Sequence, residues 1–307
     1  MTDRALDLSV NIAGIRMRNP LMVASGTFGY GEAYASFIDN NILGAIVTKG
    51  ISLEPSKGNP PPRIVETPSG LLNAIGLQNV GLEVFIREKM PYLRQFATPV
   101  IVNFYGTSID EYVRLAARLS DVPGIAGLEA NISCPNIKEG GISFGTDAAM
   151  AACVTAEIRK VTRLPLIVKL TPNVTDIGLI ARSVQDAGAD GLSITNTFTG
   201  MVIDIDTCMP ALANTTGGLS GPAIRPLALR MVWEALKRVT IPVIGLGGIM
   251  TAGDALQFLI AGASAFQIGT ALFVNPDAPF EILQGIKNYL IDRKLGSISD
   301  VIGSLRI

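Results

Sequence analysis

Cys134 is the residue of this sequence whose type and position best suit proton chemistry. It lies in the segment ANISCPN (residues 130–136), directly after a run of residues typical of a buried strand. The 307-residue chain contains no histidine, which excludes Ser–His and Cys–His pairs and removes the most usual general base. An ordinary thiol, with a pKa of about 8.5, is a few per cent ionised at neutral pH. Cys134 is therefore a candidate proton acceptor.

The other two cysteines carry no comparable signal. Cys153 lies in an apolar helical pattern, and we expect it to be buried and unreactive. Cys208 lies in a long loop. Three scattered cysteines are too few for a disulfide framework or for the four ligands of an iron–sulfur cluster. Since histidine is also missing, we expect no metal site.

Two lysines follow strand-like runs, Lys49 after residues 46–48 and Lys169 after residues 167–168. An ammonium at the buried end of a strand is costly unless an anion or a strong acceptor meets it. The two lysines therefore suggest a binding site, unless both lie in ordinary surface loops.

Four asparagines fall in segments expected at the same face: Asn73, Asn131, Asn136 and Asn196. Each amide offers one acceptor and two donors, which suits a planar ligand with alternating N–H and C=O groups. Any one of them alone is more simply explained as a turn former. Together, beside the lysines, they favour a polar cyclic substrate.

Three glycine clusters suggest a phosphate site, at residues 217–221, 245–248 and 269–270. Exposed backbone N–H groups at such turns receive a phosphate well, although glycines also simply make tight turns. No Gly-x-Gly-x-x-Gly joins a first strand to a helix, so we expect no nicotinamide-binding Rossmann unit.

The elements that must position these residues alternate between strand and helix patterns, which predicts a single (β/α)8 TIM barrel spanning residues 1–307. The predicted strands are Leu21–Ala24, Ala45–Thr48, Val100–Phe104, Gly127–Ile132, Leu166–Leu170, Gly191–Thr195, Val243–Gly245 and Ala265–Ile268. The clearest predicted helices are Ile109–Leu119, Asp147–Val161, Asp176–Ala187, Leu227–Val239 and Ala252–Ala261.

Three segments lie outside this alternation. Residues 8–17 resemble an N-terminal hairpin that plugs the floor of the barrel. Residues 51–77 and 200–220 are long insertions that follow strands, so we expect both at the C-terminal face, where barrel active sites are built.

The composition limits the class of protein. Hydrophobic residues make up 48% of the chain and charged residues 17%, which suits a large buried core and excludes disorder. The net charge of −1 comes without a basic stripe, so a nucleic-acid footprint is absent. The sequence has no signal region and no run of about 18 apolar residues, and we expect a soluble cytoplasmic protein.

Several motifs, in consistent order and spacing, resemble the class 1 dihydroorotate dehydrogenases from about residue 5 to the C-terminus. They are NAIGLQN (73–79), ANISCPN (130–136) with KEGG (138–141), KLTPN (169–173), ITNT (194–197), GGLSGPAIRP (217–226) and GLGGI (245–249). The resemblance implies a (β/α)8 barrel that holds FMN, with orotate over the flavin ring.

Carried over by position, the resemblance implies two sets of ligand-binding residues. FMN would be held by Ser25, Lys49, Gly50, Asn103, Asn131, Lys169, Thr195, Gly221, Gly247, Gly248, Gly269 and Thr270. The substrate would be held by Lys49, Asn73, Ala74, Ile75, Gly76, Leu77, Asn131, Asn136, Asn196 and Thr197. Cys134 takes the place of the base, where membrane-bound class 2 relatives carry serine. Lys169 would stabilise charge on the reduced flavin.

The residues around 138–141 and 217–226 look most like class 1B. That similarity implies electron transfer to NAD through a separate subunit with FAD and a 2Fe-2S cluster, in a heterotetramer of two subunits of each kind. Three alternatives stay open: a class 1A-type homodimer that uses fumarate, a related flavin barrel acting on dihydropyrimidines, and a non-redox phosphate-binding barrel.

Overall fold

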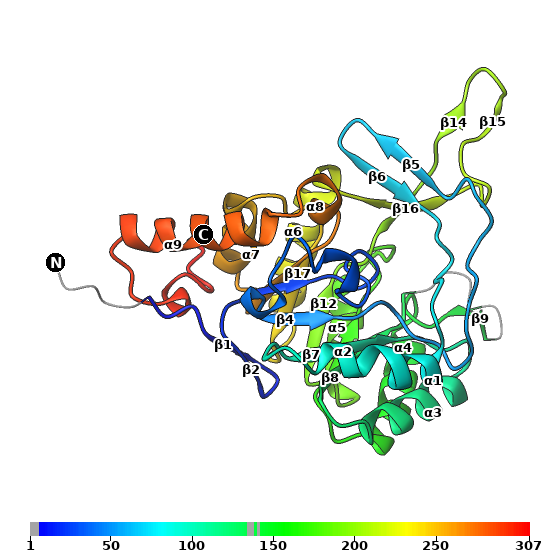
Figure 1. Cartoon of the computed structure of the whole chain (residues 1–307), viewed down its shortest axis with the longest axis horizontal. Helices are drawn as coiled ribbons and strands as arrows, with labels where there is room; N and C mark the ends of the chain where they lie inside the picture. The colour runs from blue at the N-terminus through cyan, green and yellow to red at the C-terminus, as the bar shows by residue number, and fades with distance from the viewer. Residues whose placement is uncertain (1–5, 134–137, 140–141) are drawn as a thin grey trace.

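A closed barrel of parallel strands forms the centre of the computed structural model, which describes residues 6–133, 138–139 and 142–307 (Figure 1). Among these residues, eight strands pair in the order β3-β4-β7-β8-β11-β12-β17-β18, and β18 pairs with β3 to close the ring. The strands are β3 (Leu21–Val23), β4 (Ala45–Val47), β7 (Val100–Phe104), β8 (Ile125–Asn131), β11 (Leu166–Lys169), β12 (Gly191–Ile194), β17 (Val243–Leu246) and β18 (Ala265–Ile268). The predicted barrel is confirmed, with strand ends within two residues of those expected.

Helices cover the outside of the barrel, so nearly every strand residue is buried and the strands are apolar on both faces. The helices are α1 (Leu82–Val84), α2 (Met90–Leu93), α3 (Ile109–Ser120), α4 (Ala148–Val161), α5 (Ile177–Asp186), α6 (Arg225–Leu236), α7 (Ala252–Ala261), α8 (Ala271–Val274) and α9 (Ala278–Asp292). A π-helical turn at Phe85–Lys89 joins α1 to α2, and short 3-10 turns lie at Glu32–Tyr34, Asn40–Ile42, Pro222–Ile224 and Ile298–Asp300.

The helix starts follow from local chemistry. Ser108, Asp147 and Asp176 each accept a hydrogen bond from a backbone N–H in the first turn of α3, α4 and α5. Thr251 and Asp254 form a reciprocal capping box at the start of α7.

Helix α6 ends at Leu236, three residues before the predicted end.

The expectation for Cys153 was wrong. Helix α4 turns Ala151, Val154, Thr155 and Ile158 toward the barrel, and the helical period places Cys153 on the opposite, exposed face. The apolar character of the segment conceals which face is buried, because alanines and a methionine surround the cysteine on both sides.

The N-terminal hairpin closes the floor of the barrel, as predicted. Strands β1 (Val10–Ile12) and β2 (Ile15–Met17) pair antiparallel, and Ile12, Ile15 and Met17 point inward. These side chains form one buried cluster with residues from six barrel strands: Met22, Ala45, Val47, Ile101, Ile167, Ile244 and Ala265. The lower half of the barrel is therefore an apolar core.

The two long insertions contain more structure than the sequence indicates. They contribute an antiparallel sheet ordered β13-β16-β6-β5 at the opposite end of the barrel from the N-terminal hairpin (Figure 1). Its strands are β5 (Ile64–Thr67), β6 (Gly70–Asn73), β13 (Phe198–Gly200) and β16 (Gly217–Ser220).

Two smaller antiparallel strand pairs lie outside this sheet. Strand β14 (Ile203–Asp204) pairs with β15 (Met209–Pro210) within the second insertion, and β9 (Lys138–Glu139) pairs with β10 (Ile142–Ser143) after β8.

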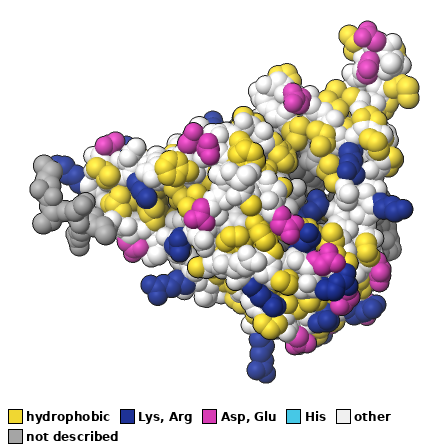
Figure 2. Space-filling model, in the orientation of Figure 1, with side chains coloured by type: hydrophobic (Ala, Val, Ile, Leu, Met, Phe, Trp, Pro, Cys, Tyr) yellow, Lys and Arg dark blue, Asp and Glu magenta, His cyan; other side chains and the backbone are white. Residues whose placement is uncertain are grey.

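The surface carries mixed charge. Acidic and basic side chains are interspersed over the face drawn in Figure 2. Hydrophobic side chains are exposed on the projecting hairpin of β14 and β15, notably Ile203, Ile205 and Met209. Within the described part of the chain, no helix is both long enough and apolar enough to cross a bilayer.

We predict that Ile12→Ala lowers the free energy of unfolding by about 2–5 kcal/mol, because it opens a cavity in the core beneath the barrel. Arg16 lies on the same hairpin with its side chain exposed, so Arg16→Ala is the matched control and should be near neutral. Urea unfolding of the two variants provides the measurement. Equal stabilities would show that the hairpin does not plug the barrel.

Candidate active site

A deep cavity of about 570 Å³ opens at the C-terminal ends of the barrel strands, under the sheet that the insertions form. This volume lies in the range of small-molecule and cofactor sites, about 300–1,000 Å³. Every residue predicted to hold FMN or substrate that falls within the described part of the chain lines the cavity. The strands deliver these residues together because parallel strands all end at the same rim.

Cys134 and Asn136 lie outside the described residues. Ser133, the residue before Cys134, is buried and lines the cavity. Its hydroxyl donates to the backbone oxygen of Lys169 at 3.0 Å, and its backbone N–H donates to the side chain of Asn131 at 3.3 Å. Ser133, which precedes Cys134 in the sequence, is thus fixed at the cavity wall.

The described asparagines that were predicted to hold the substrate are hydrogen-bonded to one another and to the sheet that the insertions form. The amide of Asn196 donates to that of Asn131 at 3.4 Å. The amide of Asn73, at the end of β6, donates to the backbone oxygen of Gly218 in β16 at 3.2 Å. These bonds fix two sides of the cavity, because Asn131 ends β8 while Asn73 belongs to the insertion.

A fully buried carboxylate, Glu129 in β8, lies behind the residues that line the cavity floor. Three other barrel strands each supply a donor to its oxygens: the adjacent β7 gives the Asn103 amide at 2.7 Å, and, across the barrel, β12 gives the Ser193 hydroxyl at 2.6 Å and β18 the Gln267 amide at 2.9 Å. Sequence reasoning missed Glu129, Ser193 and Gln267 as site residues. One sequence feature could have identified them: each is a polar residue flanked by apolar residues inside a predicted strand.

Lys169, at the end of β11, is only 4% exposed. Its ammonium lies 3.8 Å from a carboxylate oxygen of Glu129 and donates to the hydroxyl of Ser25 at 3.2 Å. The expectation that a strong acceptor or an anion meets this buried lysine is confirmed. Lys169 therefore lies in the cavity floor, paired with a buried carboxylate, and not in a surface loop.

Three buried oxygens in residues that line the cavity have no hydrogen-bond partner within the described parts of the chain: Asn103 Oδ1, Thr195 Oγ1 and Gln267 Oε1. A buried polar atom left without a partner costs about 1–3 kcal/mol. A polar ligand with N–H or O–H groups in the cavity would remove that cost. The donor and acceptor set therefore fits a nitrogen-rich ring such as that of FMN.

One corner of the cavity is made of backbone. Gly247 and Gly248 follow β17 with φ of +127° and +72°, where a side chain would be strained. A Cβ on Gly248 would also lie 2.8 Å from the backbone nitrogen of Arg225 at the start of α6. Gly269 and Thr270, after β18, complete the corner, and the Thr270 hydroxyl donates to Ser220 at 2.8 Å. Close backbone approach of this kind suits a phosphate.

Lys49 faces the cavity from the end of β4, beside Arg63 of the first insertion. Burial and the neighbouring Arg63 guanidinium both lower the pKa of the Lys49 ammonium from its usual 10.5. Arg63 is itself held by a hydrogen bond to Gln78 at 2.7 Å. Two cations at one side of the cavity favour an anionic ligand there.

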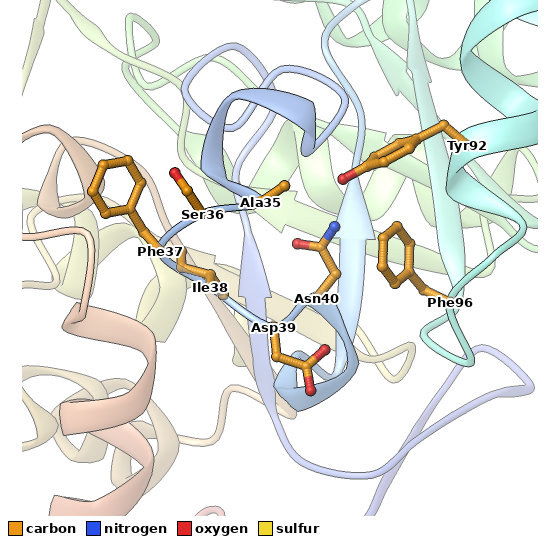
Figure 3. A pocket seen from close by; sticks show the side chains of 8 residues that line it. All are labelled: Ala35, Ser36, Phe37, Ile38, Asp39, Asn40, Tyr92 and Phe96. Atoms are coloured by element: carbon orange, nitrogen blue, oxygen red, sulfur yellow. The ribbon is translucent and has the colours of Figure 1, made fainter.

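A second hollow, of about 360 Å³, lies away from these residues, between the segment 35–40 and the side chains of Tyr92 and Phe96 (Figure 3). Both amide atoms of Asn40 are buried there without a partner among the described residues. None of the predicted site residues lines it.

Comparisons with known proteins agree with the resemblance seen in the motifs. A family model described as "Dihydroorotate dehydrogenase" matches residues 7–290. A protein of Pelobacter propionicus is 58% identical over 97% of this chain and 98% of its own length, and one of Citrifermentans bemidjiense is 57% identical over 98% and 99%. A protein of Geobacter sulfurreducens is 56% identical over 98% of this chain and 99% of its own length. All three are named "Dihydroorotate dehydrogenase B (NAD(+)), catalytic subunit".

We predict that the pKa of Lys49 is lower than that of an ordinary lysine, and that Arg63→Gln raises it. Removing a neighbouring positive charge lowers the cost of the protonated form, so the pKa of Lys49 rises toward its usual value. Competitive acetylation of the apoprotein over a pH series, read by mass spectrometry, measures this. Arg114→Gln, on the exposed face of α3, is the control and should leave Lys49 unchanged. No shift on Arg63→Gln would refute the electrostatic coupling.

Proposed function

The chain belongs to the dihydroorotate dehydrogenase family, and from that premise we propose that it oxidises (S)-dihydroorotate to orotate in pyrimidine (UMP) biosynthesis with bound FMN. The observation that carries the proposal is the cavity, which combines a charged floor, buried acceptors without partners and a glycine corner. Residues 1–307 would act as one FMN-binding barrel domain in the cytoplasm.

The proposed FMN site uses the floor and the glycine corner. Gly221, Gly247, Gly248, Gly269 and Thr270 would hold the phosphate through their backbone. The remaining contacts would come from residues around the ring: Ser25, Lys49, Gly50, Asn103, Asn131, Lys169 and Thr195. When bound, FMN supplies the acceptor for a hydride from C6 of the substrate. Lys169 would offset the negative charge that the reduced ring gains.

The proposed substrate site lies under the insertions. Amides of Asn73, Asn131, Asn136 and Asn196 would match the alternating N–H and C=O groups of the dihydroorotate ring, with Thr197 and residues 74–77 beside them. The Lys49 ammonium, next to Arg63, would face the carboxylate of the substrate. Holding the ring in one orientation is a positional contribution to the rate.

Cys134 is the proposed base. The C5 proton of dihydroorotate is α to a carbonyl, and the Cys134 thiolate would remove it while hydride leaves C6. The absence of histidine from the chain and the fixed position of Ser133 support this role. The chain contains no imidazole that could activate the thiol.

The proposed final electron acceptor is NAD. The relatives are named both for NAD and as catalytic subunits, which supports a separate partner for this chain as well. That partner would carry FAD and a 2Fe-2S cluster, in a heterotetramer of two subunits of each kind. The chain itself offers only three cysteines and no nicotinamide fingerprint, which agrees with this division.

We predict that Cys134→Ala retains FMN and orotate binding but slows flavin reduction by dihydroorotate by about 100-fold or more, the usual contribution of a general base. Anaerobic stopped-flow absorbance measures the reduction, and orotate titration checks that the site is intact. Cys208→Ala, in the exposed turn between β14 and β15, is the matched control and should reduce normally. Near-normal reduction in Cys134→Ala would remove the thiol from the mechanism.

The purified chain alone should turn over poorly with either NAD or fumarate, because the proposed route to NAD needs the partner. Co-expression with the partner subunit should restore NAD reduction. Steady-state assays with each acceptor give the measurement. Brisk fumarate turnover by the chain alone would favour a class 1A-type homodimer and contradict the proposed route.

A further inference from the structure

Glu129 is surrounded by hydrogen-bond donors. The two amide nitrogens and the ammonium around it have no capacity to accept: Asn103 Nδ2 and Gln267 Nε2 each donate to it, and Lys169 Nζ lies 3.8 Å away. The hydroxyl of Ser193 completes the set at 2.6 Å. Only the ionised carboxylate accepts from all of these groups, so the contacts describe a buried anion with its counter-ion.

An acceptor-only group at this point decides how the two amides are oriented. Because Asn103 and Gln267 both turn their NH2 groups toward Glu129, their oxygens Oδ1 and Oε1 are the atoms left without a partner among the described residues. Both residues line the cavity, Asn103 from β7 and Gln267 from β18. The carboxylate thus leaves two buried acceptor oxygens without a described partner in residues that line the cavity.

The same carboxylate holds the cation of the floor. The Lys169 side chain is 5% exposed, and without Glu129 its ammonium would keep only the neutral hydroxyl of Ser25 as a described partner. An unpaired ammonium at that depth is strongly disfavoured. The position of the Lys169 ammonium therefore depends on a residue that is itself 0% exposed and does not line the cavity.

We propose that Glu129 is a positioning residue for flavin binding: as a buried carboxylate it fixes Asn103 and Gln267 as acceptors and Lys169 as a cation toward the cofactor. The inference rests on the proposed function, since it takes FMN as the ligand of the floor. Nothing in the sequence motifs singles out Glu129 for this role.

The test compares Glu129→Gln with the wild-type chain in FMN affinity and in the midpoint potential of the bound flavin. A glutamine replaces one acceptor oxygen of the carboxylate with an NH2 group, so one of the two neighbouring amides must turn its own NH2 group toward the cavity or lose its bond. We expect the apoprotein to bind FMN at least about tenfold more weakly. Loss of a buried negative charge should also raise the potential, by about 30 mV for each tenfold gain in preference for reduced over oxidised flavin.

The control is Thr155→Val, which removes a buried hydroxyl bonded within α4 at 2.7 Å, remote from the cavity. It should lose stability while FMN affinity and potential stay at wild-type values. Glu129→Gln with wild-type affinity and potential would overturn the inference, whereas failure of the wild-type chain to bind FMN would overturn the proposed function instead.

A second variant covers the case in which Glu129→Gln does not fold. Gln267→Leu removes one oriented acceptor, leaves Glu129 with its other partners and adds only an apolar side chain to the floor. FMN affinity reduced by about threefold or more supports the inference. Wild-type affinity in Gln267→Leu would contradict it.

Discussion

A carboxylate with no access to solvent lies in the upper half of the barrel, and much of the cavity floor depends on its charge. Glu129 replaces an apolar side chain that such a barrel would normally place there, at a desolvation cost that must be offset by good geometry. Donors from β7, β12 and β18 and the ammonium of β11 supply that geometry. The barrel is thereby divided. Its lower half, closed by Ile12, Ile15 and Met17, is apolar and maintains the fold, while its upper half is polar and faces the ligand.

This division explains how a chain without histidine is equipped for redox chemistry on a small ring. Charge is supplied by two lysines in different surroundings: Lys169 is paired with Glu129, whereas Lys49 lies beside another cation and its pKa is lowered by burial and by Arg63. The first suits a cofactor ring that gains negative charge, and the second suits a ligand that already carries one. In the proposed mechanism proton removal would fall to Cys134, so that binding, charge stabilisation and proton transfer would each be carried by different residues.

The sequence was sufficient for the elements and motifs that repeat a local pattern. Strand ends followed from short β-branched runs, and polar residues at those ends, such as Asn103 and Lys169, were recognised because they interrupt such runs at a predictable place. Glu129 and Gln267 were not recognised, because they lie on strands that do not pair and meet only across the interior of the closed barrel, which local sequence patterns do not reveal. The exposure of Cys153 and the sheet formed by the insertions likewise depend on tertiary packing.

FMN bound in this cavity should be reduced by dihydroorotate. An anaerobic titration of the purified wild-type holoprotein with dihydroorotate, followed by the visible absorption of oxidised flavin, measures this. We expect one FMN per chain and complete bleaching by about one equivalent of dihydroorotate, with orotate as the product, because a hydride carries both electrons that one flavin accepts. A chain that carries no flavin, or a bound flavin that dihydroorotate leaves oxidised, would show that the cavity is not the site of this reaction.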